Sequence, residues 1–268
     1  MVLAAGAGRR LRPLTAVRPK ALCPVANRPL VDHAVGRARA VTSAVAVNVH
    51  HGRDALERHL AGDARVQVSV EEPEALGTAG ALGALAPWID GRGVLVQNAD
   101  AWSDADLSAF ADGWDGERMR LLITPGADGQ VRFGPGVGLV ASLLPWSEVA
   151  RLAPVPSGLY EVMWRRAEAD GRLDVVAHPG SFVDCGTVRQ YLQANRLAAA
   201  AQAGVDRSGS LVDASAQVIG TVDGSVVGAG ASVAGSVIGS VVWDGAAVAA
   251  GEVLVDSVRA GRLTVAVR

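Results

Sequence analysis

A glycine-rich segment near the start of the 268-residue chain is followed by basic side chains. A glycine-rich turn that leaves a strand lets backbone N–H groups approach a phosphate chain closely, and arginine or lysine adds fixed positive charge. Lys20, which follows this segment, is the only lysine among 25 basic residues. The segment therefore predicts a cradle for a triphosphate, although a tight turn packed under a helix has the same glycine spacing. Its residues are Leu3, Ala4, Ala5, Gly6, Ala7, Gly8, Arg9 and Arg10.

Two common phosphate-binding loops are excluded by the residues of this segment. A Walker loop requires Gly-Lys-Ser/Thr after the glycine-rich turn, and no such sequence follows Gly8. The dinucleotide-binding pattern G-x-G-x-x-G fails because Leu11 stands at the third glycine position. A phosphate-binding loop of another class is therefore expected.

Three further segments follow the cradle along the chain: Glu71–Leu82, Leu95–Asp100 and Phe182–Thr187. Together with Leu3–Lys20, they resemble the motifs of the sugar-1-phosphate nucleotidylyltransferases, also called nucleoside-diphosphate-sugar pyrophosphorylases. In this resemblance the first segment is the phosphate-binding signature and the second is the base-reading loop. The other two deliver metal-binding aspartates. Four motifs in the family's order are far more specific than any one of them, and with the C-terminal repeat they span nearly the whole chain.

The resemblance implies an enzyme that converts a nucleoside triphosphate and a sugar 1-phosphate to a nucleotide sugar and pyrophosphate by in-line displacement. Asp100 and Asp184 are expected to hold Mg²⁺, because this ion prefers oxygen ligands and commonly uses one or two carboxylates plus substrate phosphates. Arg10, Lys20 and Asp100 are the expected catalytic residues, the two cations stabilising charge on the departing pyrophosphate. Taken singly, each aspartate could instead be a helix cap or a turn former.

The ligand-binding residues implied by the resemblance extend beyond these. The nucleotide is expected at Leu3, Ala4, Ala5, Gly6, Ala7, Gly8, Arg9, Arg10, Lys20, Glu72, Leu76, Gly77, Thr78, Asn98 and Asp100, and the sugar phosphate at Gly136, Glu161 and Asp184. Leu76–Gly80 is similar to guanylyl-transferring members, which favours a mannose-1-phosphate guanylyltransferase-like activity. Val47–His51 and Trp102–Leu107 instead resemble the N-acetylmuramate-1-phosphate uridylyltransferases, so this alternative stays open. The adjacent His50 and His51 have no third ligand at zinc spacing and are expected to be surface residues.

One departure from the family pattern affects the acceptor. The Glu-Lys-Pro segment, whose lysine grips the sugar phosphate in the family, is absent from this chain. Arg132 or Arg172 could substitute, but guanidinium and ammonium groups are not interchangeable. The acceptor could therefore be another phosphate, such as a cyclitol phosphate or a phosphonate. A nucleotide-sugar sensor that has lost turnover is the alternative from another functional class.

Short apolar runs alternate with helix-length segments up to about residue 205, and these elements must position the motifs. Strands are expected over residues 1–5, 44–49, 66–70, 94–97, 120–124 and 137–141, and helices over 29–41, 54–60, 79–85, 160–169 and 188–203. The alternation predicts an α/β fold with a Rossmann-like, mostly parallel sheet covered on both faces. Such sheets bind ligands beyond the carboxyl ends of their strands, so the loops after Ala5, Val70 and Gln97 are expected to carry the chemistry.

The pattern changes after Ser208, where aliphatic residues recur six positions apart. They are Val212 and Val218, Val227 and Val233, then Val242, Val248 and Leu254. A six-residue repeat predicts a short left-handed parallel β-helix with three repeats to each coil, and a pair of hairpins is the alternative. The expected domains are thus a nucleotidyltransferase domain over 1–205 and a β-helix over 206–268. Because the apolar ends of a short β-helix favour a partner, a homo-oligomer is expected, whereas the lack of histidine after His178 argues against an acyltransferase.

Composition excludes several other classes of protein. With 27 acidic and 25 basic residues and no basic run, a nucleic-acid partner is not expected. Cys23 and Cys185 are too few for a disulfide framework, and no cationic leader opens the chain, so a cytoplasmic protein is expected. Residues 224–243 carry no charge, but their glycines and serines favour strands and turns over a membrane helix. No membrane association is expected.

Overall fold

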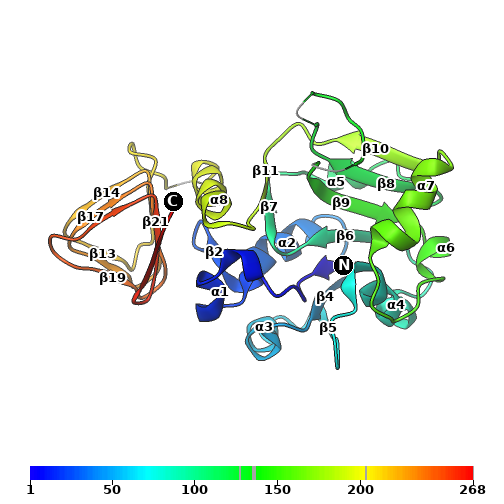
Figure 1. Ribbon diagram of the computed structural model, residues 1–268, viewed down its shortest axis with the longest axis horizontal. Coiled ribbons are helices and arrows are strands. Elements are labelled where there is room, and N and C mark those ends of the chain that lie inside the picture. Colours follow the sequence, from blue (N-terminus) through cyan, green and yellow to red (C-terminus); the bar gives the residue numbers. More distant parts are fainter. Residues whose placement is uncertain (127, 135–136, 203, 268) are drawn as a thin grey trace. The chain divides into compact units, whose positions relative to one another are not determined.

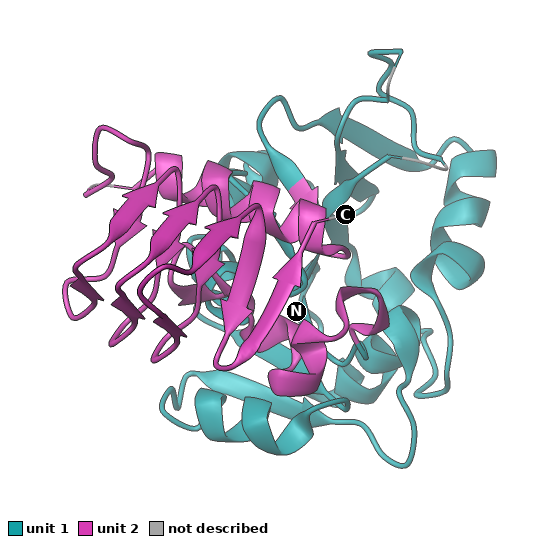
Figure 2. Ribbon diagram, turned by 60° about the vertical axis from the view of Figure 1, so that its left-hand side comes forward, with its two compact units in different colours: residues 1–7, 31–182 teal, residues 8–30, 183–268 magenta. Residues whose placement is uncertain are grey.

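The computed structural model describes residues 1–126, 128–134, 137–202 and 204–267 (Figure 1). The chain forms two compact units, which Figure 2 colours separately. Unit 1 comprises Met1–Ala7 and Val31–Phe182, and unit 2 comprises Gly8–Leu30 and Val183–Arg268. Unit 2 therefore combines part of the expected phosphate cradle with the C-terminal repeat. The domain boundary after residue 205, which was inferred from the repeat alone, stays a prediction.

Unit 1 is built on a seven-stranded sheet in the order β10-β8-β9-β6-β1-β4-β5. Neighbouring strands are parallel except at β9, which is antiparallel to both β6 and β8. The strands are β1 (Val2–Leu3), β4 (Val45–Val49), β5 (Val66–Val70), β6 (Val94–Asn98), β8 (Met119–Ile123), β9 (Leu139–Leu144) and β10 (Leu173–Ala177). The expected α/β class with a mostly parallel sheet is confirmed.

Helices cover both faces of this sheet, because successive strand residues are apolar on both sides. On one face α4, α6, η3 and α7 pack around a core that includes Leu82, Leu121 and Trp164. On the other face α5 packs through Phe110 against Leu95, and α3 packs against β4 and β5. The helices are α2 (Leu30–Arg39), α3 (Arg53–Leu60), α4 (Gly77–Ile89), α5 (Leu107–Ala111), α6 (Trp146–Val149), the π-helical turn η3 (Tyr160–Trp164) and α7 (Arg165–Ala169).

Most differences between the expected and observed elements of unit 1 lie in short segments. The helix α4 runs past the expected end and contains Pro87 in its last turn. Sequence periodicity missed β10, β7 (Ala101–Ser103) and α5, each only a few residues long. The helix α5 begins at a cap that periodicity cannot register, since Asp106 accepts hydrogen bonds from the N–H groups of Ser108 and Ala109.

The C-terminal part of unit 2 is a three-sided parallel β-helix (Figure 2). Its sides are β12-β15-β18-β21, β13-β16-β19 and β14-β17-β20, and β22 closes the first side as an antiparallel strand. The strands are β12 (Leu211–Val212), β13 (Gln217–Val218), β14 (Thr221–Asp223), β15 (Val226–Val227), β16 (Ser232–Val233), β17 (Ser236–Ile238), β18 (Val241–Val242), β19 (Ala247–Val248), β20 (Val253–Val255), β21 (Ser257–Ala260) and β22 (Leu263–Ala266). The predicted repeat module thus forms, and its hand stays a prediction.

The coils are shorter than three six-residue repeats. A buried serine stands directly before or at the start of each parallel strand of the first side, and successive serines are 15, 15 and 17 residues apart. The serines are Ser210, Ser225, Ser240 and Ser257. Each hydroxyl accepts a hydrogen bond from the N–H of the next serine, so the ladder fixes the register of the coils. The inward Val237 follows Val233 after only four positions, which explains why the six-residue spacing does not continue from Val233 to Val242.

The remainder of unit 2 consists of short N-terminal elements and one long helix. They are η1 (Arg9–Leu11), α1 (Leu14–Val17), η2 (Lys20–Leu22), the hairpin β2 (Pro24–Val25) and β3 (Arg28–Pro29), and α8 (Val188–Ala200). The helix α8 begins at a capping box formed by Thr187 and Gln190 and packs against β2, β15 and β21. Across the described ranges, the helices are all too short or too polar to cross a membrane.

Candidate active site

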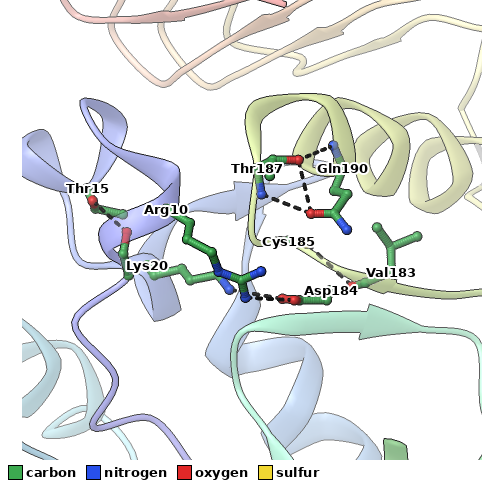
Figure 3. A network of polar contacts seen from close by, with 9 residues as sticks. Arg10, Thr15, Lys20, Val183, Asp184, Cys185, Thr187 and Gln190 are labelled. Carbon is green, nitrogen blue, oxygen red and sulfur yellow. Dashed lines mark hydrogen bonds and ion pairs between the residues drawn. The ribbon is translucent and has the colours of Figure 1, made fainter. Parts of the chain in front are cut away.

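Gly8 fixes the shape of the phosphate cradle within unit 2. Its φ of +59° lies in the left-handed region that favours glycine. A Cβ at this position would lie 2.9 Å from Lys20 Cβ and 3.0 Å from Thr15 Cγ2. The Thr15 hydroxyl donates a hydrogen bond to the Gly8 carbonyl oxygen over 3.0 Å (Figure 3). The glycine therefore allows close packing of the loop against the Lys20 and Thr15 side chains, as well as any approach of a phosphate.

The expected catalytic cations Arg10 and Lys20 meet at Asp184 (Figure 3). Lys20 Nζ lies 3.2 Å from Asp184 Oδ1, and Arg10 Nη2 lies 2.9 Å from Oδ2. The Lys20 side chain is only 5% exposed, whereas that of Arg10 is 69% exposed. Because a buried charge requires a partner, the Asp184 carboxylate stabilises Lys20 at this position. We call Arg10, Lys20 and Asp184 the charge cluster.

The local chain holds Asp184 at the end of a strand and the start of a helix. It is the last residue of β11 (Phe182–Asp184), and α8 begins after the Thr187 cap. The N–H of Gly186 donates to the Asp184 carbonyl oxygen over 2.7 Å, which forms a tight turn. A Cβ on Gly186 would lie 2.9 Å from the Arg10 guanidinium carbon, so this glycine leaves room for the Arg10 side chain.

In unit 1, a buried polar network joins the start of the cradle to the base-reading loop. Asn48 Oδ1 accepts from the N–H of Ala4 over 2.8 Å, and its Nδ2 donates to Glu71 Oε1 over 2.7 Å. Glu71 Oε2 in turn accepts from the N–H of Leu76 over 2.8 Å. Asn48 is 2% exposed and Glu71 is 1% exposed. Neither role was predicted from the sequence, although a single amide in the otherwise apolar strand β4 was a signal.

The glycines of the base-reading loop have a packing role. A Cβ on Gly77 would lie 2.6 Å from the Ser157 carbonyl oxygen, and one on Gly80 would lie 2.2 Å from the Val155 carbonyl oxygen. Gly83 is equally crowded by the backbone of Ala153. These glycines let α4 lie directly against the backbone of residues 153–157, which we call the strap.

The remaining predicted residues of this loop have polar partners on neighbouring segments. Thr78 Oγ1 accepts from the N–H of Leu159 over 2.8 Å, which joins α4 to the chain after the strap. Glu72 is largely exposed and forms an ion pair with Arg53 of α3. Leu76 precedes α4, and its carbonyl oxygen accepts from the N–H of Ser157. A carboxylate exposed beside this loop can accept hydrogen bonds from a nucleobase.

The paired histidines contact the same two loops. The His51 ring lies 3.0 Å from the Ala5 carbonyl oxygen through Nδ1, and the His50 ring lies 2.9 Å from the Glu71 carbonyl oxygen. Both therefore brace loops. In the parts of the chain that the structure describes, no three His, Cys, Asp or Glu side chains converge as a metal site.

The other predicted site residues of unit 1 divide into those at a cavity and those away from it. Leu3, Thr78 and Asn98 line a cavity of about 190 Å³. Ser142 Oγ and Trp164 Nε1 belong to residues that line this cavity, and within the described residues both atoms are buried without a hydrogen-bond partner. Such groups are stabilised when a ligand supplies the missing bond.

Asp100 lies in a turn between two strands, and Glu161 lies in the first turn of η3. Asp100 is half-buried in the turn between β6 and β7, directly after a buried strand as expected. Glu161 is exposed in η3, and its Oε2 would lie 2.0 Å from a Cβ on Gly158. Gly136 falls outside the described residues. Of the two arginines considered as substitutes for the missing lysine, Arg172 is engaged by Glu148 at 3.3 Å and Asp170 at 2.9 Å.

Comparisons with known proteins agree with these motifs. Residues 1–128 match the family model described as nucleotidyl transferase. Over 235 residues the chain is 35% identical to the N-acetylmuramate alpha-1-phosphate uridylyltransferase of Caulobacter vibrioides, covering 75% of this chain and 97% of that protein. It is 29% identical to "Probable mannose-1-phosphate guanylyltransferase 3" of Oryza sativa, covering 74% of this chain and 63% of that protein. The crystal structure of HddC from Yersinia pseudotuberculosis complexed with GMP-PN shares the fold, with a TM-score of 0.57 at 16% identity over 73% of this chain and 97% of that one.

Proposed function

Since this chain belongs to the sugar-1-phosphate nucleotidylyltransferases, we propose that its preferred substrates are UTP and an N-acetylmuramate-type sugar 1-phosphate. The match to the Caulobacter uridylyltransferase, at 35% identity over 97% of that protein, supports this choice. A second candidate pair is GTP with mannose 1-phosphate, which the sequence of Leu76–Gly80 favoured. That motif carries less information about the base than its sequence suggests, because strap packing accounts for Gly77 and Gly80.

The charge cluster is the observation that carries the catalytic part of the proposal. Arg10 and Lys20 are proposed to bind the triphosphate and to stabilise the charge that develops on pyrophosphate. A phosphate oxygen of the sugar 1-phosphate attacks the α-phosphorus, and the bond between the α-phosphorus and the bridging oxygen breaks. Pyrophosphate leaves with that electron pair, so no covalent intermediate with the protein forms. Holding both substrates in line is the main contribution of the protein in such a reaction.

Members of this family generally use a divalent metal ion, and we propose Mg²⁺ here. Asp100 and Asp184 are the proposed ligands, and their carboxylate oxygens are the donors that Mg²⁺ prefers. When bound, the ion supplies neutralisation of triphosphate charge. In the structure Asp184 pairs with Arg10 and Lys20. If Asp184 bound the metal ion instead, these two cations would be released to bind phosphate oxygens.

The remaining expected residues are proposed to bind the organic parts of the substrates. Thr78, Asn98 and the rest of the cavity are proposed to bind the nucleotide beside Glu72. The orphaned donors Ser142 and Trp164 then supply hydrogen bonds to the ligand. Gly136, Glu161 and Asp184 are proposed for the sugar phosphate. The exposed apolar residues Ile238, Val253 and Val255 on the outer face of β17 and β20 support homo-oligomerisation through the β-helix.

A substrate panel tests the proposal directly. Purified protein is assayed for pyrophosphate release with UTP, GTP and the other nucleoside triphosphates against N-acetylmuramate, mannose and glucose 1-phosphates in the presence of Mg²⁺. The highest kcat/KM is expected for UTP with N-acetylmuramate 1-phosphate. A clear preference for GTP with mannose 1-phosphate would instead establish the second candidate, and no turnover with any pair would overturn the proposed activity. Calorimetry with nucleotide sugars then identifies a sensor, which binds them but exchanges no labelled pyrophosphate.

A further inference from the structure

One ion pair attaches the loop that carries Lys20 to the β-helix, and both partners lie in unit 2. The Arg18 guanidinium donates to both carboxylate oxygens of Asp244, over 2.9 Å and 3.0 Å. The same guanidinium lies 4.9 Å from the centre of the Trp243 ring. A bidentate pair stacked on an aromatic ring fixes a side chain in direction as well as in distance. Arg18 is therefore held at a defined place on the β-helix, next to the residues that directly follow β18.

Further bonds fasten the chain after Lys20 to the same surface. Trp243, which is 2% exposed, donates from Nε1 to the Tyr191 hydroxyl over 3.0 Å, and this hydroxyl donates to the Pro24 carbonyl oxygen. Asn27 Nδ2 donates to the Val227 carbonyl oxygen over 2.9 Å. Lys20 thus lies between two attachments, one before it at Arg18 and one after it at Pro24 and Asn27.

The short chain between these attachments is itself rigid. The N–H of Leu22 donates to the Pro19 carbonyl oxygen over 2.8 Å, and the N–H of Cys23 donates to that of Lys20 over 3.0 Å. Burial raises the pKa of the Cys23 thiol to about 12, so the thiol keeps its proton and donates to the carbonyl oxygens of Arg18 and Pro19. A displacement at Arg18 is therefore passed to Lys20.

We infer that Arg18 and Asp244 are positioning residues that orient Lys20 toward the triphosphate, so that the β-helix fixes the position of the catalytic lysine. The inference adds a role for the tail within one chain, independent of any role in assembly. Its catalytic consequence rests on the proposed function, because Lys20 matters to turnover only if the chain transfers nucleotides. Its structural consequence, a change in the surroundings of the Lys20 amine, does not depend on turnover.

The sole lysine provides a selective probe. Amine acetylation with acetic anhydride, followed by peptide mass spectrometry, reports on Lys20, and an added peptide with a single lysine serves as the reference for the reagent. The test variants are Asp244→Asn and Arg18→Met, and Asp244→Glu is the conservative variant that retains a carboxylate. Asp256→Asn is the matched control, because it removes an ion pair from the β-helix to Arg196 of α8 instead of one to the Lys20 loop.

We expect Asp244→Asn and Arg18→Met to raise the acetylation rate of Lys20 severalfold relative to the added reference peptide. We also expect a fall in kcat of about tenfold with a smaller change in the KM for the nucleotide, since misplacement of a charge-stabilising group acts on the transition state. Asp244→Glu should restore part of both properties, and Asp256→Asn should resemble the wild type. Unchanged Lys20 acetylation in Asp244→Asn, or an equal increase in Asp256→Asn, overturns the inference. If the wild type turns over no substrate, the proposed function fails, and acetylation still decides the positioning role.

Discussion

The base-reading loop of unit 1 and the phosphate cradle of unit 2 are held by different physical means. The base-reading loop is fixed by buried hydrogen bonds and by glycines that lie against the strap. The part of the cradle in unit 2 is instead fixed by ion pairs, in which Lys20 is buried but Arg10, Arg18 and their carboxylate partners are partly exposed. Backbone packing and buried hydrogen bonds are insensitive to salt and lock one geometry. Exposed ion pairs contribute little stability but set direction, and they can exchange partners when a charged substrate arrives. If the two loops bind the base and the phosphates as proposed, the comparison predicts a fixed geometry at the base and ion pairs that can exchange partners at the phosphates.

Removal of the Lys20 amine is expected to have the largest effect on catalysis. Lys20→Ala should lower kcat at least roughly a hundredfold, because loss of one group that stabilises transition-state charge commonly costs this much. The measurement is pyrophosphate release with the best substrate pair from the panel, at saturating nucleotide. Arg65→Ala is the matched control, since Arg65 is 75% exposed in unit 1 and forms a surface ion pair with Asp63. Wild-type turnover in Lys20→Ala would remove the cradle from the mechanism.

Substitution of Gly80 tests the rigid side of the comparison. A Cβ in Gly80→Ala would lie 2.2 Å from the Val155 carbonyl oxygen, so α4 and the strap must separate. Overpacking of this kind typically costs about 1–3 kcal/mol of unfolding free energy. Denaturant unfolding should show this loss, and the KM for the nucleotide should rise because Gly77 moves with α4. Gly62→Ala is the control, since a Cβ there would meet only the His59 carbonyl oxygen at 3.9 Å. An unchanged unfolding curve for Gly80→Ala would contradict the packing role.

Asn48 tests whether the buried network is local to the base-reading loop. Asn48→Ala removes the Asn48 bonds to the Ala4 N–H and to Glu71 Oε1, and buried unsatisfied groups of this kind cost about 1–3 kcal/mol. The KM for the nucleotide should rise, while Lys20 acetylation in unit 2 should stay at the wild-type rate. Gln67→Ala removes an exposed amide from the neighbouring strand and serves as the control. A large increase in Lys20 acetylation would show that the two loops are not held independently.

Much of the fold follows from periodicity in the sequence. Val66–Val70 forms the predicted strand, and its neighbours in the parallel part of the sheet follow the same pattern of short apolar runs. Periodicity cannot identify the direction of β9, because direction depends on which distant strands it pairs with. Elements of only a few residues, such as α5, are too short to show a pattern. The predicted coil length of the β-helix was also wrong, because the step from the second side to the third is shorter than six residues. Val237 on the third side follows Val233 on the second after only four positions.

The candidate site was predictable where a motif required a residue type, and less so where partners lie far apart in the chain. The resemblance pointed to Lys20 and Asp184, and the structure places them 3.2 Å apart across a separation of 164 residues. The glycines of the base-reading loop were interpreted as backbone for the ligand, whereas their crowding by the strap depends on residues 153–157, which no local pattern connects to α4. The ion pair of Arg18 with Asp244 spans 226 residues and has no sequence signal at all.

The smallest expected effect concerns the acid stability of the cradle. The hydrogen bond from Arg18 lowers the pKa of Asp244 below its ordinary value of 3.8. A carboxyl group with a lowered folded pKa adds stability above its unfolded pKa, and this stability disappears as the pH falls through the folded value.

Thermal unfolding of Asp244→Asn and the wild type should therefore differ slightly near neutral pH and converge in acid below the ordinary pKa of the carboxyl group. The difference should be small because the Asp244 side chain is 51% exposed, and added salt should reduce it further. Gly80→Ala introduces no titratable group, so its deficit in stability should persist at both pH values and at both salt concentrations. If the deficit of Asp244→Asn also persisted in acid, the ion pair would not account for the way the cradle is held, and the contrast between the two loops would be lost.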